Sequence, residues 1–235
     1  MNIVIVGAAG GIGQALAELI ADRNNNDQIT ATYHQTMPQL ERPNIAWHQV
    51  DVTEEADVQW LAAACGKTDW LINAVGILHT LEEGPEKSIR QTSPAFFLQN
   101  MTTNCLPTLL LAKHFQPLLR HSEASVFATV SARVGSISEN EIGGWYSYRS
   151  SKAALNMALK NLSIEWRRSM PRCSVAALHP GTTDTPLSVP FQRNVPADKL
   201  FTPAQTAGYL LCVIDQLSPQ VSGKFWSWDG EMLPW

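Results

Sequence analysis

Charged residues, cysteines and long hydrophobic runs are all scarce in this chain. Only 16% of its 235 residues are charged, the net charge is −4 and the isoelectric point is near 5.8. The charges form no runs, so the sequence predicts no surface for nucleic acid or an anionic membrane. No apolar run approaches the length of a membrane span, and a strand-like run begins at residue 2. We therefore expect a cytoplasmic protein without a signal peptide.

Cysteine and histidine are too scattered to predict disulfides or a metal site. The four cysteines, Cys65, Cys105, Cys173 and Cys212, show no paired spacing. The six histidines do not cluster as metal ligands do. Reduced thiols and no metal are expected.

Strand-like and helix-like segments alternate along the chain, without repeats or low-complexity segments. Strands are predicted at residues 2–6, 28–33, 45–50, 69–73, 125–130, 174–178 and 224–227, with helices between them. This alternation predicts one α/β domain over 1–235, with a doubly wound, mostly parallel sheet covered by helices on both faces. Ligands of such sheets bind beyond the carboxyl ends of the strands.

A glycine-rich turn joins the first strand to the first helix. Gly7, Gly11 and Gly13 follow the apolar run 2–6 and precede a helical pattern. Glycine lets the backbone approach a pyrophosphate, whose charge is met by the free N–H groups at the helix start. The turn therefore predicts a dinucleotide site.

Tyr148 stands four residues before Lys152, so a helix places both on one face. A nearby ammonium favours the phenolate, and we expect Lys152 to lower the pKa of Tyr148 toward the range useful for proton transfer. Alone, this spacing also occurs on ordinary surface helices, and the glycine turn gives it weight.

With its glycine spacing and Tyr148-x-x-x-Lys152, the chain resembles the short-chain dehydrogenase/reductase family over its whole length, and most of all the C-factor-like carbonyl reductases. The resemblance implies a Rossmann fold and hydride transfer between a nicotinamide cofactor and a carbonyl or alcohol carbon. Tyr148 would be the acid or base, Lys152 would also hold the nicotinamide ribose, and Asn104 would anchor a proton-relay water. The cofactor would contact Gly7, Gly11, Ile12, Gly13, His34, Asp51, Val52, Asn73, Gly76, Tyr148, Lys152, Pro180, Gly181 and Thr185.

Cofactor preference depends on the residues after the second strand. NAD-selective enzymes commonly carry an acid there, whereas His34 stands where similar sequences often have arginine. We predict NADP, with NAD possible, while an exposed loop histidine is the competing interpretation. Asp51 also has two interpretations, because with Thr53 and Glu54 it could cap the next helix.

The family's active-site serine lies three residues before a glycine, and counting back from Gly135 reaches Ala132. Ser131 is one residue earlier, and on a regular strand a shift of one residue reverses the face. A bulge could re-aim it. We predict that Ser131 faces the pocket and that Ser131→Ala lowers kcat by at least about tenfold.

Two further expectations concern substrate access and assembly. Residues 183–203 carry four prolines and little periodicity, and we interpret them as a substrate lid. The apolar helical stretches 101–119 and 152–166 predict a homodimer or homotetramer. The predicted partner is otherwise a small carbonyl or alcohol substrate; the alternative function is an NADP-binding sensor with vestigial turnover.

Overall fold

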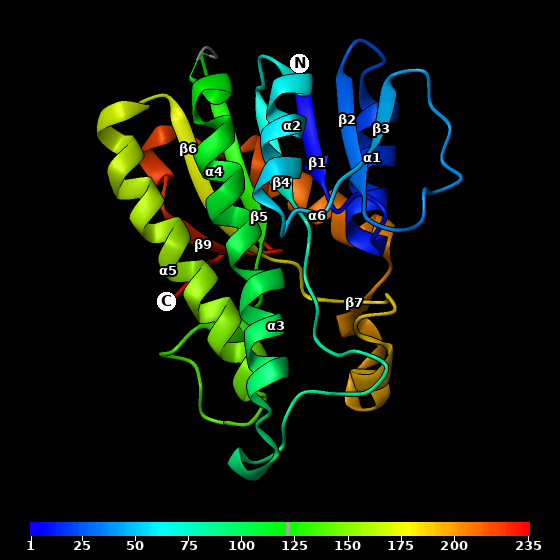
Figure 1. Ribbon diagram of the computed structural model, residues 1–235, viewed down its shortest axis with the longest axis vertical. Helices are drawn as coiled ribbons and strands as arrows, with labels where there is room; N and C mark the ends of the chain where they lie inside the picture. Colours follow the sequence, from blue (N-terminus) through cyan, green and yellow to red (C-terminus); the bar gives the residue numbers. More distant parts are fainter. Residues whose placement is uncertain (121–122) are drawn as a thin grey trace.

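The computed structural model describes residues 1–120 and 123–235 and is built on one eight-stranded sheet (Figure 1). The strand order is β10-β9-β6-β5-β4-β1-β2-β3, and all neighbours pair in parallel except β10 with β9. The order reverses between β1 and β4, which confirms the doubly wound fold. The strands are β1 (Asn2–Val6), β2 (Gln28–Tyr33), β3 (Ile45–Gln49), β4 (Trp70–Asn73), β5 (Ser125–Val130), β6 (Cys173–His179), β9 (Lys224–Ser227) and β10 (Met232–Leu233).

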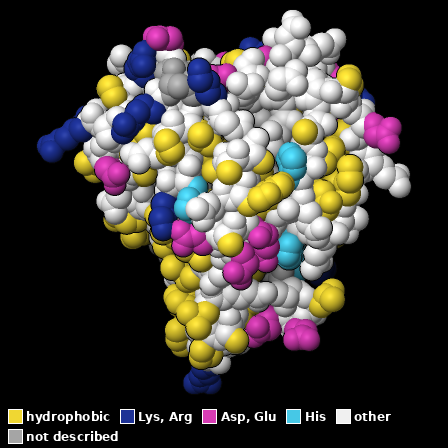
Figure 2. Space-filling view, turned by 45° about the horizontal axis from the view of Figure 1, so that its top comes forward, with side chains coloured by type: hydrophobic (Ala, Val, Ile, Leu, Met, Phe, Trp, Pro, Cys, Tyr) yellow, Lys and Arg dark blue, Asp and Glu magenta, His cyan; other side chains and the backbone are white. Residues whose placement is uncertain are grey.

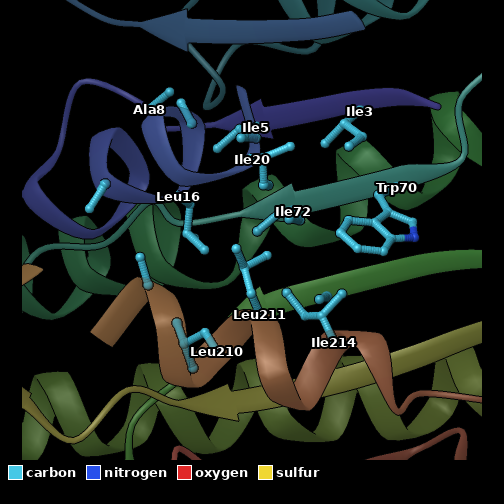
Figure 3. Packing of buried hydrophobic residues seen from close by; sticks show 14 of the residues in the cluster. Ile3, Ile5, Ala8, Leu16, Ile20, Trp70, Ile72, Leu210, Leu211 and Ile214 are labelled. Carbon is cyan, nitrogen blue, oxygen red and sulfur yellow. The ribbon is translucent and has the colours of Figure 1, made fainter. Parts of the chain in front are cut away.

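Helices cover both faces of the sheet, as the alternation of elements predicts. They are α1 (Gly11–Arg23), α2 (Glu55–Cys65), α3 (Pro94–Asn104), α4 (Leu106–Leu119), α5 (Tyr146–Ser169) and α6 (Pro203–Asp215). The core therefore has two halves. One joins α1 and α6 to the sheet, with Leu16, Ile20 and Leu210 packed on Ile5 and Ile72 (Figure 3). The other half joins α2, α4 and α5 to the opposite face.

The predicted stretch 101–119 is interrupted rather than continuous. Helix α3 ends at Asn104, Cys105 separates the two helices, and α4 starts at Leu106 with Pro107 in its first turn. Proline has no backbone N–H and cannot continue a helix hydrogen-bond ladder. The interruption places Asn104 at the last position of α3.

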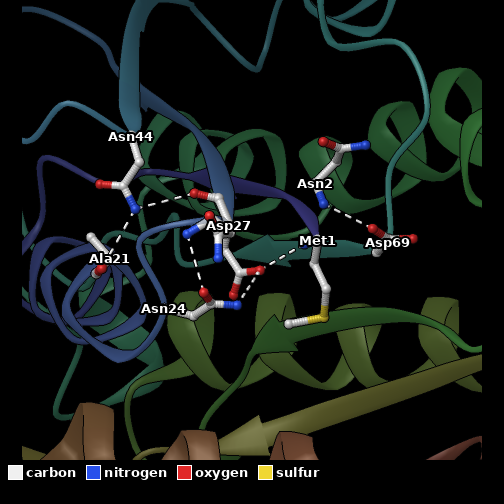
Figure 4. Close-up of polar contacts among 8 residues, drawn as sticks. Met1, Asn2, Ala21, Asn24, Asp27, Asn44 and Asp69 are labelled. Atoms are coloured by element: carbon white, nitrogen blue, oxygen red, sulfur yellow. Dashed lines mark hydrogen bonds and ion pairs between the residues drawn. The ribbon is translucent and has the colours of Figure 1, made fainter.

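Polar contacts fix the amino ends of the first strands (Figure 4). The amino group of Met1 lies 2.6 Å from Asp27 Oδ1, and Asn44 Nδ2 donates to the Asp27 carbonyl at 3.1 Å. Asn2 N donates to Asp69 Oδ2 at 2.8 Å, which ties β1 to the start of β4. The carboxyl ends of these parallel strands lie together at the opposite end of the sheet.

Within residues 1–120 and 123–235, no helix is long and apolar enough to cross a membrane. The described residues also contain no group of three or more His, Cys, Asp or Glu arranged to hold a metal ion. All four cysteines lie in this part of the chain and are free.

Candidate active site

The glycine turn is shaped by close backbone packing at the end of β1. Gly7 has φ = +77°, and a Cβ on it would lie 2.8 Å from Val75 Cγ2. A Cβ on Gly13 would lie 2.9 Å from Ala8 Cα, so α1 packs directly on the turn. Helix α1 starts without a side-chain cap and without an acid in its first turn. Its amino end therefore suits an anionic group.

Beside this turn lies a cavity of about 290 Å³, here called the Asp51 cavity, at the ends of β2 and β3. Gly7, His34, Asp51 and Val52 line it together with Thr32. Thr32 Oγ1 accepts a hydrogen bond from Gly7 N at 3.0 Å and so ties β2 to the turn. The sequence patterns did not identify Thr32 as part of the site.

Asp51 and His34 face each other across the Asp51 cavity. His34 Nε2 lies 3.4 Å from Asp51 Oδ2, and both side chains are more than one-third exposed. Thr53 donates to Asp51 Oδ1 through its hydroxyl (2.6 Å) and its amide (2.9 Å), and the hydroxyl bond lowers the pKa of Asp51. The capping residue of α2 is Glu54, so Asp51 orders the preceding turn rather than capping that helix.

A second cavity, here called the Tyr148 cavity, has a volume of about 340 Å³ and adjoins the first at Val75, which lines both. Figure 1 places this edge of the sheet toward the lower half of the view, where α3 and β7 (Thr182–Thr183) lie. Helix α5 contributes Tyr148 and Lys152 to its lining. The predicted residues that line it are Ile12, Gly76, Ser131, Tyr148, Lys152, Pro180, Gly181 and Thr185.

Burial controls the charges of the pair on α5. It raises the pKa of Tyr148 well above its ordinary value and lowers the pKa of Lys152 to about 8. The expected lowering of the pKa of Tyr148 by Lys152 is therefore wrong, because burial raises it. Lys152 Nζ lies 5.8 Å from the ring centroid of Tyr148 and donates to the Val130 carbonyl at 3.1 Å. The phenol is held in its proton-donating form.

Asn104 and Lys152 meet at Gly76. A Cβ on Gly76 would lie 3.3 Å from both Asn104 Oδ1 and Lys152 Nζ. Asn104 Oδ1 accepts from Ile77 N at 2.7 Å, and its Nδ2 donates to Ile77 O and to Ser151 Oγ. Nδ2 also donates to Asn100 Oδ1 in α3 at 3.2 Å, so the bonds of Asn104 join α3, the loop after β4 and α5 beside Lys152.

Two predicted site residues are engaged in buried bonds of their own. Asn73 donates to Thr108 Oγ1 at 3.0 Å and accepts from Val75 N, so it shapes the turn after β4. The Ser131 hydroxyl donates to Asn156 Oδ1 at 2.6 Å. Ser131 thus lies on the sheet face that α5 covers, in the wall of the Tyr148 cavity, but its proton is directed to the helix.

The segment 183–203 is more ordered than its prolines predict and lies against the Tyr148 cavity. It contains the 3₁₀ helices Val189–Asn194 and Ala197–Lys199, and β8 (Leu200–Phe201) pairs with β7. The Phe191 ring meets the Trp145 ring edge-on, with centroids 5.2 Å apart. Trp145, with φ = 52°, lines the cavity and also packs against Tyr148.

Two more residues of the site escaped the sequence patterns. The Glu86 carboxyl group, 3% exposed, accepts hydrogen bonds from the amide and hydroxyl of Ser147, directly before Tyr148. His179, the last residue of β6, lines the Tyr148 cavity and accepts a hydrogen bond from Arg133 N. Side chains alternate along a strand, so His179 shares the face of Val175 and Ala177, which pack on the α5 side of the sheet. No local signal in the sequence marks Glu86.

Comparison with known proteins agrees with this geometry. The sequence profile of the short chain dehydrogenase family matches residues 1–195 of this chain. The chain belongs to the short-chain dehydrogenase family. Membership confirms the predicted resemblance, and the enzyme class that it implies is an oxidoreductase.

Two curated relatives of this short-chain dehydrogenase cover most of its length. A 1-hydroxy-2-glutathionyl-2-methyl-3-butene dehydrogenase of Rhodococcus sp. (strain AD45) is 32% identical over 239 residues, covering 100% of this chain and 99% of that protein. The C-signal protein of Myxococcus xanthus is 35% identical over 171 residues, covering 72% of this chain and 94% of that protein.

Solved structures share the fold. The NADPH-bound carbonyl reductase from chicken fatty liver superposes with a TM-score of 0.87 at 25% identity, covering 99% of this chain and 93% of that one. The carbonyl reductase Sniffer of D. melanogaster superposes with a TM-score of 0.86 at 24% identity, over the full length of both chains. The second likeness shows the fold alone.

Proposed function

We propose that this protein is an NADP(H)-dependent reductase of small or medium-sized apolar carbonyl compounds. The observation that carries the proposal is the Tyr148 cavity, in which a protonated phenol lies beside Lys152 at the carboxyl edge of a doubly wound sheet. The walls are largely apolar, with Leu78, Val134, Trp145 and Phe191 among them. Such walls suit a substrate with little charge.

The two adjoining cavities fit a dinucleotide. Gly7 lines the Asp51 cavity and Gly76 the Tyr148 cavity, on either side of the shared Val75, and the amino end of α1 supplies N–H groups beside them. His34, Asp51 and Val52 would surround the adenosine half, and Ile12, Pro180, Gly181 and Thr185 the nicotinamide half. When bound, the nicotinamide supplies the hydride. The carbonyl reductase that superposes at 25% identity is NADPH-bound, which supports the same cofactor here.

Tyr148 would give its proton to the substrate oxygen as hydride reaches the carbonyl carbon. Its raised pKa keeps the phenol protonated over the ordinary pH range, which suits the reductive direction. Lys152 would hold the ribose of the cofactor and receive a proton through a water that Asn104 would anchor beside Gly76. The assembly of these three side chains favours an enzyme over an NADP-binding sensor.

The segment 183–203 would act as the substrate lid. Leu187, Ser188, Phe191 and Val195 from this segment line the Tyr148 cavity, opposite the residues of α5. A Cβ on Gly11 would lie 2.6 Å from Thr185 Cγ2, so the base of the lid touches the glycine turn. Cofactor binding at the glycine turn would therefore affect the position of the lid through this contact.

A homodimer or homotetramer would cover the outer faces of α4 and α5. Leu109, Met157 and Ile164 expose about half of their side chains. A band of hydrophobic side chains runs down the lower left of the face in Figure 2, on the side where Figure 1 places α3 and α5. A light-scattering mass of one chain at micromolar concentration would contradict this assembly.

Oxidation of NADPH and NADH, followed optically against a panel of aldehydes, ketones and quinones, tests the function. We expect turnover with NADPH on at least one apolar carbonyl compound. Tight NADPH binding without turnover on any of them would favour the sensor instead.

A further inference from the structure

Reduction of a carbonyl group in the Tyr148 cavity, as proposed above, develops negative charge on the substrate oxygen. Enzymes stabilise such charge with preorganised hydrogen-bond donors directed at that oxygen. Tyr148 is one donor in the cavity wall. The question is which second side chain can donate, because Ala132, also in the wall, cannot.

Most other polar side chains in the wall are engaged elsewhere. The Ser131 hydroxyl donates to Asn156, and Arg133 pairs with Glu139 at 2.8 Å. Thr183 Oγ1 bonds to Thr206 Oγ1 at 2.8 Å, and the Ser188 hydroxyl donates to the Thr183 carbonyl. Thr185 Oγ1 donates to the Thr183 carbonyl at 3.5 Å. The remaining donors in the wall are His179, Thr182 and the indole N–H of Trp145, whose ring packs on Tyr148 and Phe191.

The sheet register brings His179 to the right face. Val130 pairs with Leu178, which packs on the α1 and α6 side, so the next residue, His179, faces α5 and lines the same cavity as Tyr148. Ser131 N donates to the Leu178 carbonyl at 2.7 Å, which continues the register beyond β5. His179 therefore lies directly beside Ser131 and the turn of residues 132–135.

One hydrogen bond determines which nitrogen of His179 can donate. Arg133 N donates to Nδ1 at 3.3 Å, so Nδ1 is the acceptor and the hydrogen of a neutral ring is on Nε2. Burial, with a smaller contribution from Arg133, lowers the pKa of His179 to about 4, so the ring is neutral near pH 7. Nε2 accepts or donates no hydrogen bond among the described residues and is not fully buried, and the ring that carries it lines the Tyr148 cavity.

We propose that His179 donates an Nε2–H hydrogen bond to the substrate carbonyl oxygen beside Tyr148 and serves as the second oxyanion donor of this enzyme. The proton that is transferred comes from Tyr148, and the Nε2–H bond of His179 stays intact throughout. The role that the sequence assigns to Ser131 would then belong to a residue from the neighbouring strand.

The test compares His179→Ala, His179→Gln, Ser131→Ala and Thr182→Val on the best carbonyl substrate of the wild-type protein. Glutamine places an amide N–H near the position of Nε2. Thr182→Val removes the hydroxyl of Thr182 and keeps the shape of the side chain, and Trp145→Phe, measured alongside, removes the indole N–H. We expect His179→Ala to lower kcat about a hundredfold, with KM for the carbonyl changed less than about threefold and NADPH affinity unchanged. His179→Gln should recover at least about tenfold of that loss.

A second-site variant separates a donor role from a structural one. Ala132→Ser introduces a hydroxyl into the cavity wall beside His179 and should restore kcat partly in the His179→Ala background. Wild-type kcat in His179→Ala, or a larger loss in Ser131→Ala, Thr182→Val or Trp145→Phe, would overturn the assignment of the donor to His179. A wild-type protein without turnover on any carbonyl would instead overturn the proposed function, and with it this role.

Discussion

Removal of the Glu86 carboxyl group should destabilise the fold and disable the site together. Glu86 reaches the start of α5 from the long loop after β4, 61 residues away in sequence, and its oxygens accept the amide (3.1 Å) and hydroxyl of Ser147. Ser147 is the second residue of α5 and is completely buried. An acid here also meets the positive end of the helix dipole. Tyr148 follows directly.

The expected magnitude follows from the two donors that would lose their acceptor. A buried donor left unpaired costs about 1–3 kcal/mol, so Glu86→Ala should lower the free energy of unfolding by about 2–6 kcal/mol. That is a large part of the stability of an ordinary domain, about 5–15 kcal/mol. The kcat should fall as well, because the start of α5 positions the phenol.

Urea unfolding followed by circular dichroism, with kcat measured in parallel, tests this expectation. Glu86→Gln is the matched control, since its amide oxygen keeps one acceptor, and it should cost roughly half as much or less. Ser147→Ala removes the hydroxyl but leaves the amide bond and should cost about 1 kcal/mol. An unfolding free energy of Glu86→Ala within about 0.5 kcal/mol of wild type would refute the reasoning.

Three further predictions concern the cofactor site and Lys152. Gly7→Ala should weaken NADPH binding at least about tenfold and lower the unfolding free energy by about 1–3 kcal/mol, because of its positive φ and the contact with Val75. Gly10→Ala is the control, since its Cβ would approach only Gly7 O, at 3.4 Å; equal losses in titrations of the two variants would contradict this account. His34→Asp should shift the kcat/KM ratio toward NADH, because a carboxylate accepts from a ribose 2′-OH and repels a 2′-phosphate; an unchanged ratio removes His34 from the site. Since burial lowers the pKa of Lys152 to about 8, the lysine is charged below that pH and loses its charge as pH rises through it, so kcat/KM should fall above about pH 8. Lys152→Arg, whose guanidinium stays charged, should lower the rate but show no such fall.

The sheet was predictable because its strands carry strong local signals. Strands β1, β2, β5 and β9 have the predicted bounds, since each is a short, β-branched or buried run beside turn residues. Strand β10 and the pair β7 and β8 are two residues each and were missed. A segment this short has no period to detect. The helical stretch predicted at 101–119 is divided into α3 and α4, and Pro107 marks the division in the sequence.

Some site residues were predictable because they belong to short motifs whose members lie close together in the sequence. Tyr148 and Lys152 share one helix, and the glycine turn follows one strand. Contacts between distant segments were not predictable. The bond of Ser131 to Asn156 and the bond of Glu86 to Ser147 each join elements whose approach depends on the whole fold. The predicted direction of the pKa shift of Tyr148 was wrong because the sequence does not show how deeply the phenol is buried, and burial raises its pKa.

The central claim is that Tyr148 is the proton donor to a carbonyl substrate, and Tyr148→Phe tests it most directly. The measurement is kcat for NADPH oxidation on the best carbonyl substrate, with NADPH affinity determined in the same variant. The account predicts that turnover is lost almost completely while NADPH affinity stays close to wild type, because the phenol acts on the substrate oxygen. A Tyr148→Phe protein that keeps half of the wild-type rate would contradict it.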